Sequence, residues 1–236
     1  MTQSTSYSLA VFCLMGIYLT LGEEISTSEQ QFSLTCGAKY SDGNVILMQS
    51  TTFGRRNCSY DILWKMEQLC SGRPQCSVDM KKDNLDWRGK CRGQEDYIEA
   101  SYKCVKIQVN DNKGCPKNSD SIAKLPSGFF TLNVYKSGFF TGGYDCPWLI
   151  QAKPGQRIKL YLYDFITESN WSLGFCNYMA FAEETTAPPK ERPHKICGIY
   201  GVRRRLVFSS KTDAIIVTIS RNSDVNYGLL EYEGNG

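Results

Sequence analysis

Cysteine is the residue type with the most chemistry available to it in this sequence, because 11 of the 236 residues are cysteine. Thiolates bind metals, but structural zinc requires paired Cys-x2-Cys motifs, and the sequence has none. Disulfides persist in secreted proteins and are rare in the reducing cytosol. A cysteine content this high therefore predicts an extracellular chain that is stabilised by disulfides.

Side chains suited to catalysis are scarce. The single histidine, His194, ends a proline-rich segment at residues 188–194, and we expect it at the surface. A Ser-His-Asp triad needs a nucleophile beside its histidine, and the sequence has no nucleophile elbow. It has no glycine-rich phosphate loop either, and carboxylate pairs such as Glu183 and Glu184 are common on surfaces. We expect that the protein is not an enzyme and that it needs no cofactor.

Charge is nearly balanced, with 27 basic against 24 acidic residues and a formal net charge of +3. Nucleic-acid-binding domains carry a stronger basic excess, so we expect no nucleic acid as a partner. Arg203, Arg204 and Arg205 could attract sulphated glycans. However, alternate residues of a strand point to opposite faces, so the three guanidinium groups need not form one patch.

Residues 1–22 have the features of a secretory signal peptide. Residues 9–21 form an apolar run, and Gly22 follows it before the acidic pair Glu23 and Glu24. The run is shorter than the about 20 residues that span a bilayer, and a small residue at its end favours cleavage. Residues 1–8 carry no Lys or Arg, so an uncleaved anchor is the alternative. We predict a secreted, extracellular protein with no membrane span after signal removal.

Removal of the signal peptide also removes Cys13 and leaves ten cysteines, an even number that allows complete pairing. Six of them precede the polar segment at residues 109–114 and four follow it, so each half can close its own bridges. We therefore divide the chain into a domain at residues 23–108, a linker at 109–114 and a domain at 115–233. Domains this small benefit from disulfides.

The first half mixes two hydrophobic patterns. Residues 44–49, with four apolar residues in a row at 45–48, are typical of a buried strand, and residues 97–104 alternate as a half-buried strand does. Residues 60–69 are typical of a helix, with Asp61 at its start as an N-cap or first-turn carboxylate. The apolar face of this helix holds Ile62, Leu63, Met66 and Leu69. Strands and a helix in one small unit indicate an α/β domain.

The second half is typical of an all-β domain. Residues 157–163 alternate between aliphatic and polar side chains, and residues 206–208 and 214–219 are further strand candidates. Turn signals lie between these runs, and no helical stripe is present. This pattern indicates an antiparallel β-sandwich.

Two stretches of the first half carry a resemblance to a known family. The motif Thr-Phe-Gly-Arg at residues 52–55 follows a strand, and residues 91–98 lead into the strand that ends at Cys104. Together with the cysteine spacing, they resemble the galactose- and rhamnose-binding lectin domain first known from sea urchin eggs, over about residues 31–107. The family usually has eight cysteines, and this half has six. The resemblance implies the disulfides Cys36–Cys104, Cys58–Cys91 and Cys70–Cys76.

The sugar-binding positions of that family are altered in this sequence, although Arg55 of its Tyr-Gly-Arg motif is kept. Phe53 replaces the Tyr of that motif and loses the hydroxyl. Gly89 replaces an Asp, Asp96 reverses the charge of a Lys, and the segment that carries a Glu after the family's first cysteine is missing. Sugars are held by several convergent hydrogen bonds. These changes predict that the family's usual galactose or rhamnose site is lost.

The second half resembles a CUB domain over about residues 115–233. Cys-Pro-Trp-Leu-Ile at residues 146–150 and Pro-Gly-Gln-Arg-Ile-Lys-Leu at residues 154–160 are the specific part of the match. The resemblance implies a jelly-roll sandwich with disulfides Cys115–Cys146 and Cys176–Cys197.

Many CUB domains bind calcium through a Glu and two Asp residues. At the positions of the two Asp residues this sequence has Met179 and Asn222, and only Asp164 or Glu168 could supply the Glu. Calcium prefers carboxylate oxygens, which a thioether cannot replace. We therefore expect no calcium and no other metal in this domain.

Two sequons, at Asn57 and Asn170, predict a glycoprotein. Asn170 is the better acceptor, because Cys58 within the first sequon is expected to be bridged. The whole sequence favours a secreted, non-catalytic recognition protein, nominally a carbohydrate-binding lectin with a diverged sugar site. New hydrogen bonds from Arg92, Glu95 and Asp96 would then hold a different glycan. The alternative is an extracellular adaptor that binds proteins, including cell-surface proteins, through both modules, or a lectin-like domain that serves only as a spacer.

Overall fold

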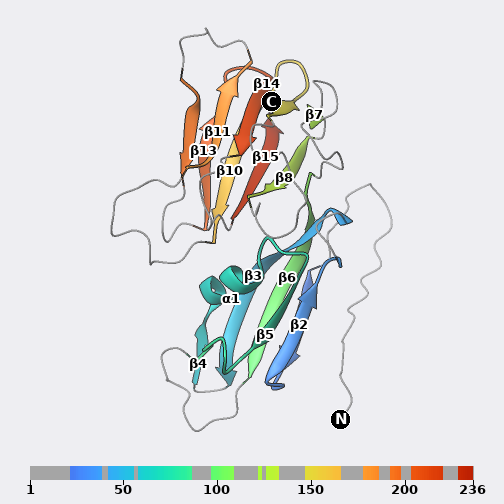
Figure 1. Ribbon diagram of the computed structural model, residues 1–236, viewed down its shortest axis with the longest axis vertical. Coiled ribbons are helices and arrows are strands. Elements are labelled where there is room, and N and C mark those ends of the chain that lie inside the picture. The colour runs from blue at the N-terminus through green and yellow to red at the C-terminus, as the bar shows by residue number, and fades with distance from the viewer. Residues whose placement is uncertain are drawn as a thin grey trace.

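The computed structural model describes residues 22–38, 42–55, 58–86, 97–108, 122–123, 126–132, 147–165, 178–185, 192–197, 203–219 and 228–235. It is mostly β-sheet and forms two units, an N-terminal unit of residues 22–108 and a C-terminal sandwich of residues 122–235 (Figure 1). The predicted signal peptide, apart from Gly22, and the predicted linker lie outside the described residues. No helix in the described ranges is both long enough and apolar enough to cross a membrane.

The N-terminal unit combines strands with a helix. Its four-stranded sheet has the order β1-β6-β3-β4, and a separate ribbon pairs β2 with β5. Every one of these pairings is antiparallel. The mixture of helix and strand agrees with the expectation, but the helix lies against an antiparallel sheet and does not cross between parallel strands. The elements are β1 (Glu23–Thr27), β2 (Gln31–Thr35), β3 (Asn44–Arg55), β4 (Cys58–Asp61), α1 (Leu63–Cys70), β5 (Gln75–Asp79) and β6 (Ile98–Lys106).

The start of α1 depends on Asp61. Its Oδ1 accepts the backbone N–H of Leu63 at 2.6 Å, one of the first-turn N–H groups that have no partner within a helix. Ile62 is the N-cap, so Asp61 stands one residue before it. Of the predicted apolar face, Ile62 and Met66 are fully buried, whereas Leu63 and Leu69 pack half-buried against the same core.

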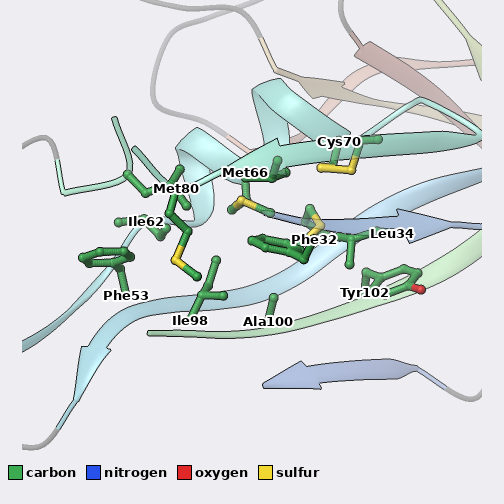
Figure 2. Packing of buried hydrophobic residues seen from close by; sticks show 14 of the residues in the cluster. Phe32, Leu34, Phe53, Ile62, Met66, Cys70, Met80, Ile98, Ala100 and Tyr102 are labelled. Carbon is green, nitrogen blue, oxygen red and sulfur yellow. A yellow bond between two sulfur atoms is a disulfide. The ribbon is translucent and has the colours of Figure 1, made fainter. Parts of the chain in front are cut away.

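A hydrophobic core fills the space between the sheet, α1 and the β2–β5 ribbon (Figure 2). Phe32 and Leu34 enter it from alternate positions of β2, and Met66 and Cys70 enter it from the helix. The Cys70–Cys76 disulfide fastens the end of α1 to β5 beside this core.

The C-terminal sandwich has two sheets around one core. One sheet has the order β13-β10-β15-β8, and the other has the order β12-β11-β14-β9-β7. Leu160 and Leu230 from the first sheet and Ile150 and Val217 from the second belong to a single buried cluster, in agreement with the β-sandwich expected. The elements are β7 (Ile122–Ala123), β8 (Ser127–Thr131), β9 (Trp148–Gln151), β10 (Arg157–Asp164), β11 (Tyr178–Glu184), β12 (His194–Cys197), β13 (Arg204–Ser209), β14 (Ala214–Ile219) and β15 (Gly228–Asn235).

Strand β3 is buried on both of its faces. Its four consecutive residues 45–48 are each at most 1% exposed. Because side chains alternate along a strand, Ile46 and Met48 enter the N-terminal core, whereas Val45 and Leu47 point to the opposite face. That opposite face is covered by the sandwich. We call the shared cluster the junction cluster; its members are Val45, Leu47, Val105, Ile107, Tyr163, Phe165 and Leu229, with Phe129 packed against them.

Candidate functional site

The junction between the two units is held by backbone contacts as well as by the junction cluster. The backbone N–H of Gln108 donates to the carbonyl of Phe129 at 2.8 Å, next to an isolated bridge between Ile107 and Phe129. The Gln108 side chain donates from Nε2 to the hydroxyl of Tyr232 at 2.9 Å. The residues just before the predicted linker are therefore part of the junction, so the N-terminal unit docks directly on the sandwich.

Arg203 makes a further link across the junction. Its Nε donates to Glu67 Oε1 of α1 at 2.6 Å, although the two residues are 136 positions apart in the sequence. Its two terminal nitrogens donate to the carbonyls of Met48 and Gln49 in β3. The ladder between β3 and β6 shifts register between Met48 and Ser50. Such a bulge leaves the extra residue out of the ladder, and the Gln49 carbonyl is accordingly open to the guanidinium.

Glu67 is the only buried carboxylate among the described residues, with 6% of its surface exposed. Burial raises the pKa of Glu67 to about 6, because desolvation disfavours the charged form, although the neighbouring Arg203 lowers it. A carboxyl group whose pKa is raised to about 6 changes its charge close to physiological pH. Sequence reasoning missed it, because nothing near position 67 in the sequence points to Arg203.

The basic triplet does not form one cationic patch, an outcome that the alternation along the strand had left open. Arg203 enters the junction, and Arg205 donates to the carbonyl of Cys197 at 2.5 Å. Arg204 points to the other side, where its Nε and Nη2 donate to Glu231 at 2.8 Å and Glu233 at 2.9 Å. Each guanidinium thus has protein partners, which leaves the triplet poorly suited to a sulphated glycan.

The outer face of the sheet β13-β10-β15-β8 is divided between the junction and solvent. Tyr163 and Leu229, which are paired in register, lie under the N-terminal unit in the junction cluster. Burial raises the pKa of Tyr163 to about 12, and its hydroxyl lies 3.1 Å from Glu231 Oε2. Two residues earlier on β10, Tyr161 pairs with Leu206, which is 48% exposed. We call the solvent-facing remainder, with Lys159, Tyr161, Arg204, Leu206, Glu231 and Glu233, the open outer face.

The open outer face has an aromatic and aliphatic centre with charges around it. The Arg204 guanidinium carbon lies 3.6 Å from the centroid of the Tyr161 ring, a distance at which cation–π attraction is strong. Arg204 also forms ion pairs with both glutamates of β15. Arg157 and Lys159 lie on the same side of β10 as Tyr161 by alternation, and Lys159 is opposite Glu233 in the ladder. The face therefore combines apolar side chains with three basic and two acidic ones, a small excess of positive charge.

The lectin-equivalent ring is inside the protein. Phe53 is 1% exposed and belongs to the N-terminal core, where its ring centroid lies 5.9 Å from that of Tyr60. Gly54, the next residue of the motif, has a φ of 94°, which favours glycine. Phe53 and Gly54 of the motif are thus explained by packing and by backbone geometry, and the Phe53 ring presents almost no surface to a ligand.

The other predicted sugar-site residues cannot be placed around Phe53. Arg55 ends β3, where it pairs with Cys58 in the ladder. Gly89 and Asp96 lie outside the described residues, as do Arg92 and Glu95, so the site predicted for another glycan stays a prediction. The sequons at Asn57 and Asn170 also lie outside them.

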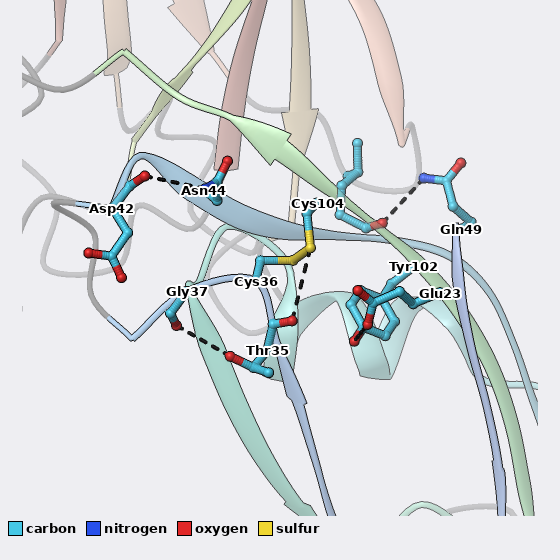
Figure 3. Close-up of a disulfide and its surroundings, with 10 residues drawn as sticks. Glu23, Thr35, Cys36, Gly37, Asp42, Asn44, Gln49, Tyr102 and Cys104 are labelled. Carbon is cyan, nitrogen blue, oxygen red and sulfur yellow. Dashed lines mark hydrogen bonds between the residues drawn. A yellow bond between two sulfur atoms is a disulfide. The ribbon is translucent and has the colours of Figure 1, made fainter. Parts of the chain in front are cut away.

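The structure contains the disulfides Cys36–Cys104 and Cys70–Cys76, two of the pairs that the lectin resemblance implies. Figure 3 shows the first, which links the end of β2 to β6 near the hydrogen bond between Tyr102 and Glu23. Cys58 and Cys197 are disulfide-bonded as well. Their predicted partners Cys91 and Cys176, and the predicted pair Cys115–Cys146, lie outside the described residues.

The positions expected to matter for metal binding are only partly described, whereas the single histidine is among the described residues. No group of three potential metal ligands occurs in the part of the chain that the structure describes; Asp164 ends β10, while Glu168 and Asn222 lie outside that part. His194 is exposed, as predicted, but it lies on β12, where its ring centroid is 5.5 Å from that of Phe208.

Comparisons with known proteins add little. No protein-family model matches the chain, and no curated protein matches it. Among solved structures, the chain is similar to one described as the CUB1-EGF-CUB2 domain of human MASP-1/3, with 11% sequence identity and a TM-score of 0.30, over 90% of this chain and 99% of that one. A likeness at this TM-score supports no conclusion about fold or function. The two sheets and their shared core identify the C-terminal unit as a sandwich.

Proposed function

We propose that the protein is an extracellular, non-catalytic recognition protein that binds a protein partner through the open outer face of its sandwich. The observation that carries the proposal is the pair Tyr161 and Leu206, which stand opposite each other on β10 and the edge strand β13. Leu206 is 48% exposed although it lies in mid-strand beside an aromatic ring. Aromatic residues and arginine are enriched at the centres of protein interfaces, and Arg204 stacks on this ring.

The charge of the face indicates the chemistry of the partner. Arg204 forms ion pairs with Glu231 and Glu233, and Arg157 and Lys159 on the same side of β10 give the face a small excess of positive charge. The partner would therefore bring acidic side chains around an apolar contact. The CUB resemblance of the sequence supports the same class of function, and the disulfides are compatible with an extracellular location.

The burial of Phe53 argues against the family's usual sugar site as the binding surface. Sugar recognition needs convergent polar groups at an open surface, and a ring that is 1% exposed cannot contribute a stacking surface. Carbohydrate binding by other residues of the N-terminal unit stays a prediction, and the experiment below separates it from protein recognition.

The test uses the full chain with its disulfides intact. It is applied to an array of purified extracellular proteins and to a glycan array that contains galactose and rhamnose. The variants are Leu206→Asp and Lys159→Glu. Trp64→Asp is the matched control, because Trp64 is the other large apolar residue exposed among those described, at 44%, and it lies on α1.

We expect binding to an acidic protein that survives competition by both sugars. Leu206→Asp should weaken it about tenfold or more, as the loss of a central contact does. Lys159→Glu should slow association and reduce its dependence on salt, and Trp64→Asp should change nothing. Binding to a glycan that free sugar competes and that Leu206→Asp leaves intact would overturn the proposal. Loss of protein binding with Trp64→Asp alone would place the surface on the helix and refute the assignment of the open outer face.

A further inference from the structure

The buried ion pair between Glu67 and Arg203 joins elements that belong to different units. Glu67 lies on α1, and Arg203 precedes β13. The side chain of Glu67 is 8% exposed, whereas that of Arg203 is 36% exposed. The guanidinium thus covers the carboxylate and remains partly in contact with water itself. Ion pairs in which one partner is desolvated are sensitive to the protonation state of that partner.

Arg203 does not depend on Glu67 alone. It also donates to the carbonyls of Met48 and Gln49, which accept hydrogen bonds at any pH. Protonation of Glu67 would therefore remove a buried negative charge while the guanidinium keeps two of its three acceptors. Among the described residues, Arg203 is the one side chain that donates to the carboxylate, so the negative charge of Glu67 is poorly compensated.

The other charged groups around Glu67 do not stabilise its negative charge. Asp61, at the start of α1, repels it, and Lys65 lies two positions away on the helix, where side chains do not face each other. Arg73 follows the helix and donates to the carbonyl of Gln68 at 3.4 Å. From β3, the neighbouring groups are backbone carbonyls. Arg203 is thus the one cation placed against the carboxylate among the described residues.

We infer that Glu67 is a proton-linked latch between the two units, and that acidification strengthens their docking. When the units separate, Arg203 no longer covers Glu67, so the carboxyl group is hydrated and regains its ordinary affinity for protons. Docking is then accompanied by proton uptake, which favours the docked state in acid.

The direction of the pH effect on docking follows from the pKa of Glu67 in the docked and in the undocked state. The pKa of Glu67 is raised from 4.5 to about 6 in the docked protein, mainly by burial and against the effect of Arg203. A state that binds more protons gains stability as the pH falls. The favourable contribution is fully present below the undocked pKa of 4.5 and is lost as the pH rises through about 6. A shift of this size changes the docking constant by about 30-fold over its full range, and by about eightfold between about pH 7.5 and 5.

One backbone amide reports docking directly. The N–H of Gln108 donates to the carbonyl of Phe129 across the junction, so its hydrogen exchange requires the units to separate locally. We expect its protection factor, corrected for the intrinsic effect of pH, to rise about eightfold from about pH 7.5 to 5 in the full chain. Glu67→Gln should abolish this rise while keeping an acceptor for Arg203. Glu29→Gln is the matched control, because Glu29 is exposed, and it should behave as the wild type does.

A protection factor that is flat or falls on acidification of the wild type would overturn the inference, as would an unchanged pH dependence in Glu67→Gln. If Glu67→Gln fails to fold, carbon-13 NMR titration of the wild-type Glu67 carboxyl decides instead. A midpoint near 6 supports the latch, and a midpoint at or below about 4.5 refutes it.

Discussion

Two leucines on one sheet face test whether the units are docked in solution. Leu229 and Leu206 both point outward from the sheet β13-β10-β15-β8, yet Leu229 is 0% exposed and Leu206 is 48% exposed. The difference arises because the N-terminal unit covers Leu229 with Val45 and Leu47. If the units were not docked, the two leucines would be in similar surroundings. Leu229→Ala and Leu206→Ala therefore form a matched pair.

The expected magnitudes differ clearly. Leu229→Ala removes three buried carbon atoms, worth about 0.8 kcal/mol each, and leaves a cavity that raises the total to about 3 kcal/mol. This corresponds to a fall of about 6–12 °C in the melting temperature of a chain of this size. Leu206→Ala should lower the free energy of unfolding by less than about 1 kcal/mol, because exposed sites lose little.

The assay is urea unfolding of each variant with its disulfides intact, followed by tryptophan fluorescence and by far-ultraviolet circular dichroism. Leu47→Ala, on the opposite side of the junction, completes a double-mutant cycle with Leu229→Ala. We expect a coupling free energy of about 0.5–3 kcal/mol, as for residues that share a cluster. Equal destabilisation by the two leucine substitutions, or a coupling near zero, would refute the docked arrangement.

Three further outcomes can be checked in the same way. Thr51 Oγ1 is buried and has no hydrogen-bond partner among the described residues, so Thr51→Val should leave the free energy of unfolding unchanged or raise it by up to about 1 kcal/mol in urea unfolding; a clear loss would reveal a partner. In the chain-entropy model, removal of Cys36–Cys104, which spans 68 residues, should cost about 4 kcal/mol, whereas removal of Cys70–Cys76, which spans 6, should cost about 2; the reverse order would contradict the model. The pKa of Asp79 is lowered from 3.8 to about 2, first by the backbone N–H of Lys82; its contribution to stability is present above pH 3.8 and is lost as the pH falls towards 2, so Asp79→Asn should flatten this acid limb of the stability curve.

The sequence predicted much of the fold because local patterns determined it. The helix near residues 63–70 and the alternating strand at residues 157–164 follow from spacing alone. Asp61 accepts from the first turn of the helix as an acidic residue at its start would, but it lies one residue before the N-cap and not in the first turn. The junction was missed, although one signal for it was present. The continuous apolar run at residues 45–48 indicates a strand that is covered on both faces, and a single small core covers only one. The sandwich provides the second cover.

The candidate site was less predictable, because its residues meet only after folding. Arg203 and Glu67 are 136 positions apart, and neither stands in a motif. The basic triplet shows what alternation does predict: Arg203 and Arg204 separate to different partners, as expected for neighbours on a strand. For Phe53, in contrast, the sequence pattern did not predict the role of the side chain. Its position in the motif suggested a ligand contact, whereas its ring is packed in the N-terminal core.

The junction limits how each unit can be studied and how it can bind. Val45, Leu47 and Ile107 are at most 2% exposed in the full chain, so an isolated N-terminal unit would present a contiguous apolar surface to water. Such surfaces promote association, and binding by the separated unit would then reflect exposed junction residues rather than a native site. In the full chain, the same burial places the open outer face directly beside the N-terminal unit, since Tyr161 and Tyr163 lie two residues apart on β10. A partner that contacts Tyr161 therefore meets a surface whose position relative to the N-terminal unit is fixed by packing and does not depend on a flexible linker.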